Sequence, residues 1–320
     1  MIEVEVPPLD FTQTTGGLPL WPGATSATVV SAPDSLGWTY HHHPDIACWK
    51  GRLYVAWNAC ERDEDTWPSR ELYSMSQDGK RWSAPQELFP QGISTPLRMY
   101  FYHSPEGRFF ALAGKRVSQE PTREATKGPL VARELHADHT LGPVFDGAEL
   151  QADPLFLAQQ DYGRLLPEAG VFATSKALSF FRRGDGAWVA VGKKRWVAIS
   201  HDDGATWTEP ACPPTLITNM GKVWGQRLPG GRFLLAYNPH EHYRFPLALV
   251  TSDDGVHFGK MQVAHTELPA RRFEGLHKSI GASYARGLSP WSSDGSRSES
   301  CAWLVYSMHK EEIVVTCLPL

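Results

Sequence analysis

The stretch Ser200-His201-Asp202-Asp203-Gly204-Ala205-Thr206-Trp207 follows the pattern S-x-D-x-G-x-T-W, which predicts a stapled hairpin turn. The Asp202 carboxylate is expected to accept backbone N–H bonds inside the turn, as aspartate does in Asx-turns. Gly204 permits a positive φ at no steric cost, and the Trp207 indole is expected to pack beneath the hairpin. We therefore interpret the motif as a structural element of a β-sheet, not as a catalytic group.

Two further copies give the motif a period. Residues 251–258 keep the same spacing with conservative changes at both ends. Residues 75–82 keep the glycine and the tryptophan but place Gln77 where the pattern requires aspartate, so we expect this copy to be degenerate. Gly204 and Gly255 are 51 residues apart, close to the roughly 40–50 residues of a four-stranded propeller blade.

The motif resembles the Asp box, or BNR repeat, of the sialidase-like β-propeller superfamily. Short apolar strands at 45–49 and 53–57, separated by a turn, fit the same architecture. We expect an all-β fold in which residues 1–320 form a single β-propeller of four-stranded blades. Seven blades are favoured over six, because blades of roughly 45 residues fill the chain about seven times. Residues 1–37 are expected to close the ring by pairing with a strand at 313–316.

Composition narrows the class of protein. The chain has 320 residues and 42% hydrophobic residues, which is enough for a large core. A net charge of −4 and a pI near 6.4 argue against nucleic acid or an anionic membrane as a partner. Without a signal peptide or an apolar stretch of membrane-spanning length, we expect a cytoplasmic protein. Five cysteines without a C-x-x-C motif predict neither a disulfide framework nor a zinc site.

Three consecutive histidines, His41, His42 and His43, precede the predicted strand at 45–49. Strand alternation would place His41 and His43 on one face and His42 on the other. Imidazole titrates near neutral pH and therefore suits proton transfer. We expect no metal at this run, because adjacent side chains rarely converge on one ion. No cofactor is required, and a structural divalent cation and the oligomeric state are left open.

Other polar and aromatic clusters are expected in loops at the mouths of the central channel, where propellers collect function. They are Arg98 with Tyr102 and His103; Lys222 with Trp224; His240 with Tyr243 and Arg244; and Lys278 with Tyr284 and Arg286. Cations pair with carboxylates, and aromatic rings stack on sugar faces. The set therefore predicts an acidic oligosaccharide or polysaccharide as substrate, although such residues also decorate ordinary surfaces. The carboxylate run at 61–65 is either an acid for glycoside hydrolysis or a solvated loop.

Several segments resemble the propeller polysaccharide lyases, such as ulvan lyases and rhamnose–glucuronate lyases, and the related α-L-rhamnosidases. These segments are residues 40–44, 62–65, 73–76, 244–252 and 305–312. The chain departs from that pattern at His41, where the lyases are expected to carry asparagine, and it lacks the R-I-P arginine motif of true sialidases near its N-terminus. The resemblance implies an enzyme that cleaves a uronate- or rhamnose-containing glycan, with His and Tyr as acid and base and Arg as carboxylate neutraliser.

The leading hypothesis is β-elimination beside a uronic acid, in which a cation neutralises the carboxylate and a base removes the neighbouring proton. Its assigned residues are His42 or His43 and His103 for proton transfer, Tyr102 or Tyr243 as the acid, and Arg98, Lys222 and Arg244 as carboxylate ligands. One alternative is an exo-glycosidase of sialidase or α-L-rhamnosidase type, with Asp63 or Asp65 as the acid and Tyr284 and Arg286 in the pocket. The other is a non-catalytic glycan-binding propeller.

Overall fold

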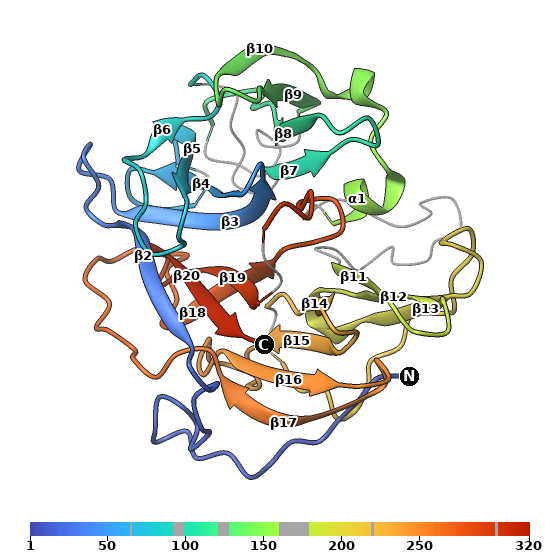
Figure 1. Cartoon of the computed structure of the whole chain (residues 1–320). Helices are drawn as coiled ribbons and strands as arrows, with labels where there is room; N and C mark the ends of the chain where they lie inside the picture. The colour runs from blue at the N-terminus through green and yellow to red at the C-terminus, as the bar shows by residue number, and fades with distance from the viewer. Residues whose placement is uncertain (65, 92–98, 121–127, 160–178, 219–220, 298–299) are drawn as a thin grey trace.

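The computed structural model describes residues 1–64, 66–91, 99–120, 128–159, 179–218, 221–297 and 300–320. In these ranges the strands form five sheets, arranged around a common centre as the blades of a propeller (Figure 1). The predicted all-β propeller is confirmed, but the predicted seven blades are wrong. Long connections between sheets, such as residues 264–281, use residues that the repeat length had assigned to additional blades.

Three blades follow the chain without interruption. Blade I contains β3 (Tyr40–Trp49), β4 (Arg52–Cys60), β5 (Ser69–Ser76) and β6 (Gln86–Glu87). Blade II contains β7 (Tyr100–His103), β8 (Phe109–Gly114), β9 (Leu130–Leu135) and β10 (Leu141–Asp146), and is followed by η2 (Gly147–Leu150) and α1 (Pro154–Ala158). Blade III contains β11 (Ser179–Arg182), β12 (Trp188–Val191) and β13 (Val197–Ser200), with η4 (Lys193–Arg195) between the last two strands. All pairings within these blades are antiparallel.

The two remaining blades each take a strand from the N-terminal segment. Blade IV contains β14 (Trp224–Arg227), β15 (Phe233–Tyr237), β16 (Ala248–Ser252) and β17 (His257–Val263), and β1 (Glu3–Val4) joins its outer edge in parallel. Blade V contains β18 (Ala282–Gly287), β19 (Cys301–Met308) and β20 (Glu312–Pro319), and β2 (Thr25–Ser31) pairs antiparallel with β20. The N-terminal segment therefore adds an outer strand to each of the last two blades through backbone hydrogen bonds.

The first strands of the blades line the centre of the ring. Contacts join β3 to β7, β11 to β14, β14 to β18 and β18 to β3. Apolar side chains fill the space between neighbouring sheets; Trp57 and Val305 share the layer between blades I and V, and Trp49 and Phe109 share the layer between blades I and II. These innermost strands surround a central channel. The residues at one end of the strands therefore meet at one mouth of the channel, and those at the other end meet at the opposite mouth.

The turn after β13 is the predicted Asp box. Asp202 Oδ1 accepts a hydrogen bond from Thr206 N at 2.8 Å, and Gly204 N donates to Ser200 Oγ at 2.8 Å. The indole of Trp207 donates to the Gly204 carbonyl at 3.0 Å. Both the positive φ of Gly204 and the anchoring role of the tryptophan are confirmed.

The copy at residues 75–82 is a complete box, so its prediction as degenerate is wrong. The aspartate of this box is Asp78, which follows Gln77. Its Oδ1 accepts from the backbone N–H groups of Lys80 at 2.9 Å and Arg81 at 2.8 Å, and Ser76 Oγ accepts from Gly79 at 2.8 Å. The two boxes differ in spacing. One residue separates the aspartate from the glycine in the box at 200–207, whereas the two residues are adjacent in the box at 75–82.

A buried ion pair joins three blades inside the ring. Arg286 Nη1 on β18 donates to Asp45 Oδ1 on β3 at 3.0 Å, and each side chain is at most 5% exposed. The other Asp45 oxygen accepts from Phe101 N on β7 at 2.8 Å. Arg286 Nη2 donates to the Gln159 carbonyl at 3.1 Å, and its guanidinium lies 4.0 Å from the centre of the Tyr100 ring. Blades I, II and V are thus fixed to one another by one pair of charges.

Asp45→Asn is expected to lower the free energy of unfolding by about 3 kcal/mol or more, because it leaves the Arg286 charge buried without its counter-ion. Equilibrium unfolding in urea measures this change. The matched control is Asp203→Asn, since Asp203 pairs with Arg182 at 2.6 Å on the surface, where the expected cost is under about 1 kcal/mol. Equal costs for the two variants would contradict the importance of the buried pair.

Candidate functional site around Tyr284

Two β-bulges face each other where β3 passes β18. The β3–β4 register shifts immediately after His42, and His43 has a φ of 50°. The β18–β19 register also shifts, at the position where Tyr284 has a φ of 57°. Bulges of this kind re-aim side chains and occur often beside active sites. Here they direct His42, His43 and Tyr284 toward one another.

The predicted alternation of the three histidines is wrong because of the bulge in β3. The rings of His42 and His43 lie 4.2 Å apart, and they lie 4.5 Å and 4.7 Å from the Tyr284 ring. They therefore share one side of the strand. His41 points elsewhere, where its Nδ1 accepts a hydrogen bond from the Trp57 indole at 3.2 Å.

Three cations from three different segments surround the Tyr284 ring. Lys222 Nζ lies 4.5 Å from the ring centre, Lys193 Nζ lies 5.0 Å from it, and the Arg244 guanidinium carbon lies 5.4 Å from it. Lys193 Nζ also donates to the phenol oxygen of Tyr284 at 2.8 Å. We call the group made by His42, His43, Glu64, Lys193, Lys222, Arg244, Tyr284 and Lys310 the Tyr284 cluster.

Glu64 is the carboxylate of the Tyr284 cluster. One oxygen lies 3.3 Å from His43 Nε2 and the other lies 3.3 Å from Lys310 Nζ. Burial acts to raise the pKa of Glu64, but the hydrogen bond with His43 and the charge of Lys310 outweigh it and hold this pKa well below its usual value. Glu64 is therefore an anion near neutral pH, and it serves as a counter-ion and not as a proton donor.

His42 and Arg244 have buried nitrogen atoms with no hydrogen-bond partner among the described residues. These atoms are both ring nitrogens of His42 and the Nη1 of Arg244. Burial lowers the pKa of His42 well below its usual value, and the nearby charges of Lys310, Lys222 and Arg244 act in the same direction. His42 is thus a neutral imidazole. Since buried polar groups are almost always hydrogen-bonded, these atoms are the natural positions for ligand contacts.

Five of the residues predicted from the sequence meet in this cluster: His42, His43, Lys222, Arg244 and Tyr284. Two more lie beside it. Tyr243 precedes Arg244 and is 49% exposed, with its ring stacked 5.1 Å from Phe245. The nearby His240 shapes this loop, because its Nδ1 accepts the backbone N–H groups of His242 and Tyr243.

Two predicted residues lie deeper in the channel. Arg286 is held by Asp45, as described above. The Trp224 ring lies 5.7 Å from the Arg286 guanidinium, and its indole donates to Gln226 Oε1 at 2.7 Å. Both side chains are buried, and both contribute to the packing under the Tyr284 cluster.

The structure does not bring Tyr102 or His103 to the cluster. The Tyr102 ring packs 4.5 Å from Phe156, and burial raises the pKa of its phenol. His103 Nε2 lies 3.2 Å from the carbonyl of Cys48, near the end of β3 opposite to His42. Their predicted partnership with His42 in proton transfer therefore has no geometric basis. Arg98 lies outside the described residues.

Lys193 and Lys310 belong to the cluster, but the sequence did not mark them as site residues. Lys193 begins η4, and Lys310 lies in the turn between β19 and β20 with a φ of 60°. Lysine is common in exposed turns, so neither position stands out in a sequence. Their convergence on Tyr284 and Glu64 depends on the closure of the ring.

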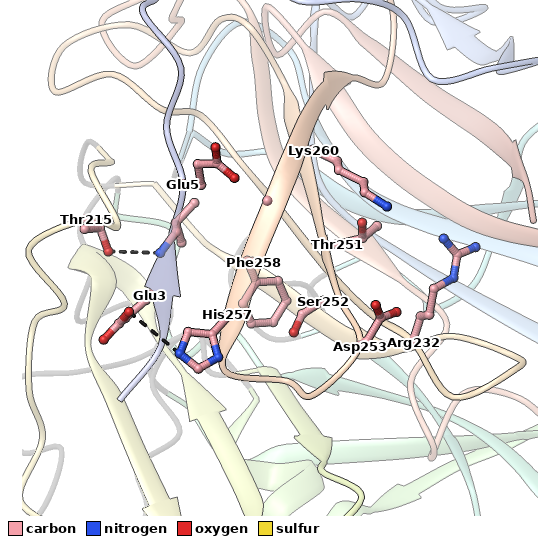
Figure 2. Close-up of a pocket in the computed structure, with 12 residues that line it drawn as sticks. Glu3, Glu5, Thr215, Arg232, Thr251, Ser252, Asp253, His257, Phe258 and Lys260 are labelled. Carbon is pink, nitrogen blue, oxygen red and sulfur yellow. Dashed lines mark hydrogen bonds and ion pairs between the residues drawn. The ribbon is translucent and has the colours of Figure 1, made fainter.

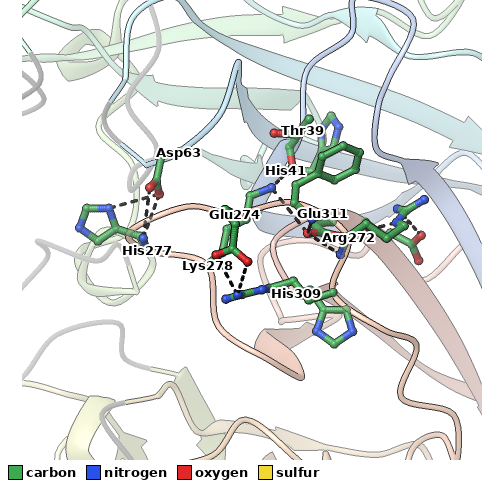
Figure 3. Close-up of polar contacts among 12 residues, drawn as sticks. Thr39, His41, Asp63, Arg272, Glu274, His277, Lys278, His309 and Glu311 are labelled. Carbon is green, nitrogen blue, oxygen red and sulfur yellow. Dashed lines mark hydrogen bonds and ion pairs between the residues drawn. The ribbon is translucent and has the colours of Figure 1, made fainter.

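Two carboxylates beside the 264–281 connection, those of Asp63 and Glu311, accept hydrogen bonds from its backbone (Figure 3). Asp63, an expected acid, accepts a hydrogen bond from His277 N at 3.1 Å, and Asp65 lies outside the described residues. Glu311 is buried and accepts the backbone N–H groups of Arg272 and Phe273 at 3.1 Å and 2.8 Å. Lys278 donates to the Thr39 carbonyl at 2.7 Å. This network fixes the connection that leads to Tyr284.

A separate cavity of about 450 Å³ lies at the outer edge of blade IV, beside β1 (Figure 2). His257 there lies 3.8 Å from Glu3 and 2.7 Å from Asp254, so opposite charges are already paired. None of its lining residues belongs to the Tyr284 cluster. Among the described residues, no group of three or more His, Cys, Asp or Glu could hold a metal ion. No helix in the same ranges is long and apolar enough to cross a membrane.

Comparisons with known proteins identify the fold. The family described as "Beta-prop_BT_1020:-like, N-terminal beta propeller" matches residues 24–146. A solved structure described as a sialidase aligns over 100% of this chain with a TM-score of 0.87 and 25% identity, and the chain spans 35% of its length. No curated protein sequence matches the chain. The chain therefore has a sialidase-like β-propeller fold.

More distant structures share this fold. A Trypanosoma rangeli sialidase in complex with 2,3-difluorosialic acid aligns over 94% of this chain and 59% of its own, with a TM-score of 0.59 and 13% identity. A leech intramolecular trans-sialidase aligns over 90% of this chain and 68% of its own, with a TM-score of 0.55 and 10% identity. The expected relationship to polysaccharide lyases receives no support from these matches.

The free energy of unfolding is expected to fall as the pH drops below about 4.5, the ordinary pKa of a glutamate. The folded-state pKa of Glu64 lies below that value, so its stabilising contribution is complete above the unfolded pKa and is lost as the pH falls through the folded pKa. Urea unfolding of the wild type and Glu64→Gln at about pH 7, 5 and 3.5 should show a difference that shrinks with acidity. Glu87→Gln, which removes an exposed carboxylate paired with Arg70, is the control. A constant difference across the pH range would contradict this role of Glu64.

Proposed function

We propose that the protein is a glycoside hydrolase that removes an acidic sugar residue from a glycan. The observation that carries this proposal is the buried Arg244 Nη1, which has no hydrogen-bond partner among the described residues, on a guanidinium 5.4 Å from the Tyr284 ring. Arginine binds carboxylates through paired N–H groups. A sugar carboxylate beside Arg244 would satisfy the unpaired donor.

The position of Lys222 supports a carboxylate ligand at this place. Its ammonium group is buried on the same tyrosine ring as the Arg244 guanidinium, so both cations face the space above Tyr284. Arg244 is partly exposed, whereas Tyr284 and Lys222 are buried. The sugar would therefore approach past Arg244 and the exposed side chain of Tyr243.

Tyr284 and His42 are the groups we assign to the chemistry. The ammonium of Lys193 next to the Tyr284 oxygen stabilises negative charge on that oxygen, which favours its attack on the anomeric carbon. The bond to the leaving oxygen breaks in the same step, and that oxygen takes up a proton. His42 is neutral and has both nitrogens available, so it can pass the phenol proton of Tyr284 to the leaving oxygen. In the second step it can accept a proton from the water that attacks the anomeric carbon and return this proton to the Tyr284 oxygen as the sugar is released.

The comparisons support hydrolysis over β-elimination. The solved structures named above are sialidases and a trans-sialidase, and one of them is described as a covalent intermediate with 2,3-difluorosialic acid. These activities belong to those proteins. For this chain, a phenol among cations is a suitable nucleophile, whereas Tyr102 and His103, two of the residues expected to assist His42 in elimination, lie elsewhere in the fold.

Incubation with 4-methylumbelliferyl glycosides of sialic, glucuronic and galacturonic acid, and with rhamnosyl–glucuronate oligosaccharides, is expected to release an acidic monosaccharide that has gained water. Mass spectrometry and ultraviolet absorbance of the products decide the reaction. Arg244→Gln should lower kcat/KM for the acidic substrate about a hundredfold, through lost carboxylate binding. Tyr284→Phe should abolish turnover and leave the affinity for the acidic sugar nearly unchanged, because it removes the reacting oxygen alone.

The matched controls are Arg232→Gln, in the turn between β14 and β15, and Tyr73→Phe, on β5. They alter the same residue types away from the Tyr284 cluster and should retain full activity. Thermal unfolding confirms that each variant is folded. Ultraviolet absorbance from an unsaturated product without gain of water would identify β-elimination and overturn the proposal. Equal turnover of galactosides and acidic glycosides would remove the carboxylate from substrate recognition.

A further inference from the structure

The end of the channel opposite to Tyr284 is built from the other ends of the same strands. Ser283 pairs with Ser307, whereas Gly287 pairs with Leu304 farther along blade V. The residues beyond Gly287, and those at the start of β19, therefore lie away from the Tyr284 cluster. Arg182 is the last residue of β11 and Arg227 is the last residue of β14, and both lie at this same end. We call this region the distal mouth.

The distal mouth contains a cavity of about 290 Å³. Three arginines and two tryptophans are among its lining residues: Arg182, Arg227, Arg297, Trp188 and Trp303. A groove of about 1080 Å³ adjoins it, because both are lined by Arg297, Cys301 and Trp303, and this groove adds Lys80. Small-molecule sites commonly measure about 300–1000 Å³. The combined space is enough for several linked sugar units.

Arginine and tryptophan side chains are stacked in pairs on this surface. The Arg297 guanidinium lies 4.9 Å from the centre of the Trp303 ring, and the Arg182 guanidinium lies 5.8 Å from that of Trp188. Trp188 in turn stacks on Trp291 at 6.0 Å with an interplanar angle of 13°. Stacking on an aromatic face fixes the orientation of a guanidinium and leaves its N–H edge directed outward.

The charges of the cavity are poorly compensated by the side chains that line it. Arg182 pairs with Asp203 at 2.6 Å. Arg297 Nη1, by contrast, is buried without a hydrogen-bond partner among the described residues. The described residues that line the 290 Å³ cavity include no carboxylate. An unpaired buried guanidinium N–H is costly in the free protein, and an anionic ligand would satisfy it.

We propose that the distal mouth is a second binding site, which holds an acidic oligosaccharide without cleaving it. The arginine edges would bind the carboxylates or sulfates of the chain, and the tryptophan faces would receive its sugar rings. A single-stranded nucleic acid would also use arginines and aromatic rings. The net charge of −4 opposes the long-range attraction on which nucleic-acid binding depends, so we favour the glycan.

The test measures binding of polygalacturonate to the folded protein by isothermal titration calorimetry. Arg244→Gln is present in every sample, so that binding at the Tyr284 cluster is weakened and is the same throughout the comparison. Adding Arg227→Gln and Arg297→Gln should weaken the affinity about tenfold or more, because two charge-assisted hydrogen-bond donors are lost. Arg232→Gln, which removes an arginine of the β14–β15 turn that lines the separate 450 Å³ cavity and not the distal mouth, should leave the affinity unchanged. This result does not depend on any catalytic activity.

Three outcomes would overturn the proposal. The first is unchanged affinity in the protein with Arg227→Gln and Arg297→Gln, with its thermal midpoint confirming that it is folded. The second is equal binding of carboxyl-reduced polygalacturonate, which would show that the anionic groups are not recognised. The third is tighter binding of single-stranded RNA than of polygalacturonate at the same ionic strength, which would identify the other class of polymer.

Discussion

The buried pair between Asp45 and Arg286 is the constraint on which the site depends. Asp45 follows the bulge that re-aims His42 and His43, and Arg286 lies two residues after Tyr284. The 3.0 Å contact between these two charges therefore fixes the position of β3 along its axis relative to β18. A shift along either strand would separate the imidazoles from the phenol, and it would leave two charges in a low-dielectric interior. The geometry of the cluster is thus a consequence of how two blades are joined.

The Tyr284 cluster holds cations in a buried environment, and this arrangement costs desolvation free energy before any ligand binds. Burial lowers the pKa of Lys310, although its ammonium lies 3.3 Å from the Glu64 carboxylate. Sites that concentrate charge in this way are preorganised for an ion of opposite sign, because the protein's dipoles need not rearrange when it arrives. The distal mouth is built differently, because the guanidinium groups of Arg182 and Arg297 lie against the indole rings of Trp188 and Trp303. The two ends of the channel would thus bind negative charge by different means.

Local features were predictable from the sequence, and features created by ring closure were not. The Asp box at 200–207 and the strands around 45–57 depend on turn chemistry and on alternation within a few residues. The number of blades depends on connection lengths, which no local pattern restricts. The convergence of His42 with His43 required a bulge, and bulges leave little trace in side-chain periodicity. Arg244 and Tyr284 were identifiable as site residues from their residue types. Lys193 and Lys310 could be recognised only once the structure placed them beside Tyr284 and Glu64.

The pairing of β2 with β20 imposes an order of events on a growing chain. The strand Thr25–Ser31 is synthesised early, yet its partner, Glu312–Pro319, emerges almost three hundred residues later. At a ribosomal rate of about 5–20 residues per second, this strand waits tens of seconds as an open, hydrogen-bonding edge. Its threonines and valines favour extended structure, so it is a template for pairing with other nascent chains. A protein with this closure therefore benefits from a chaperone that holds its N-terminal segment until the fifth sheet is complete.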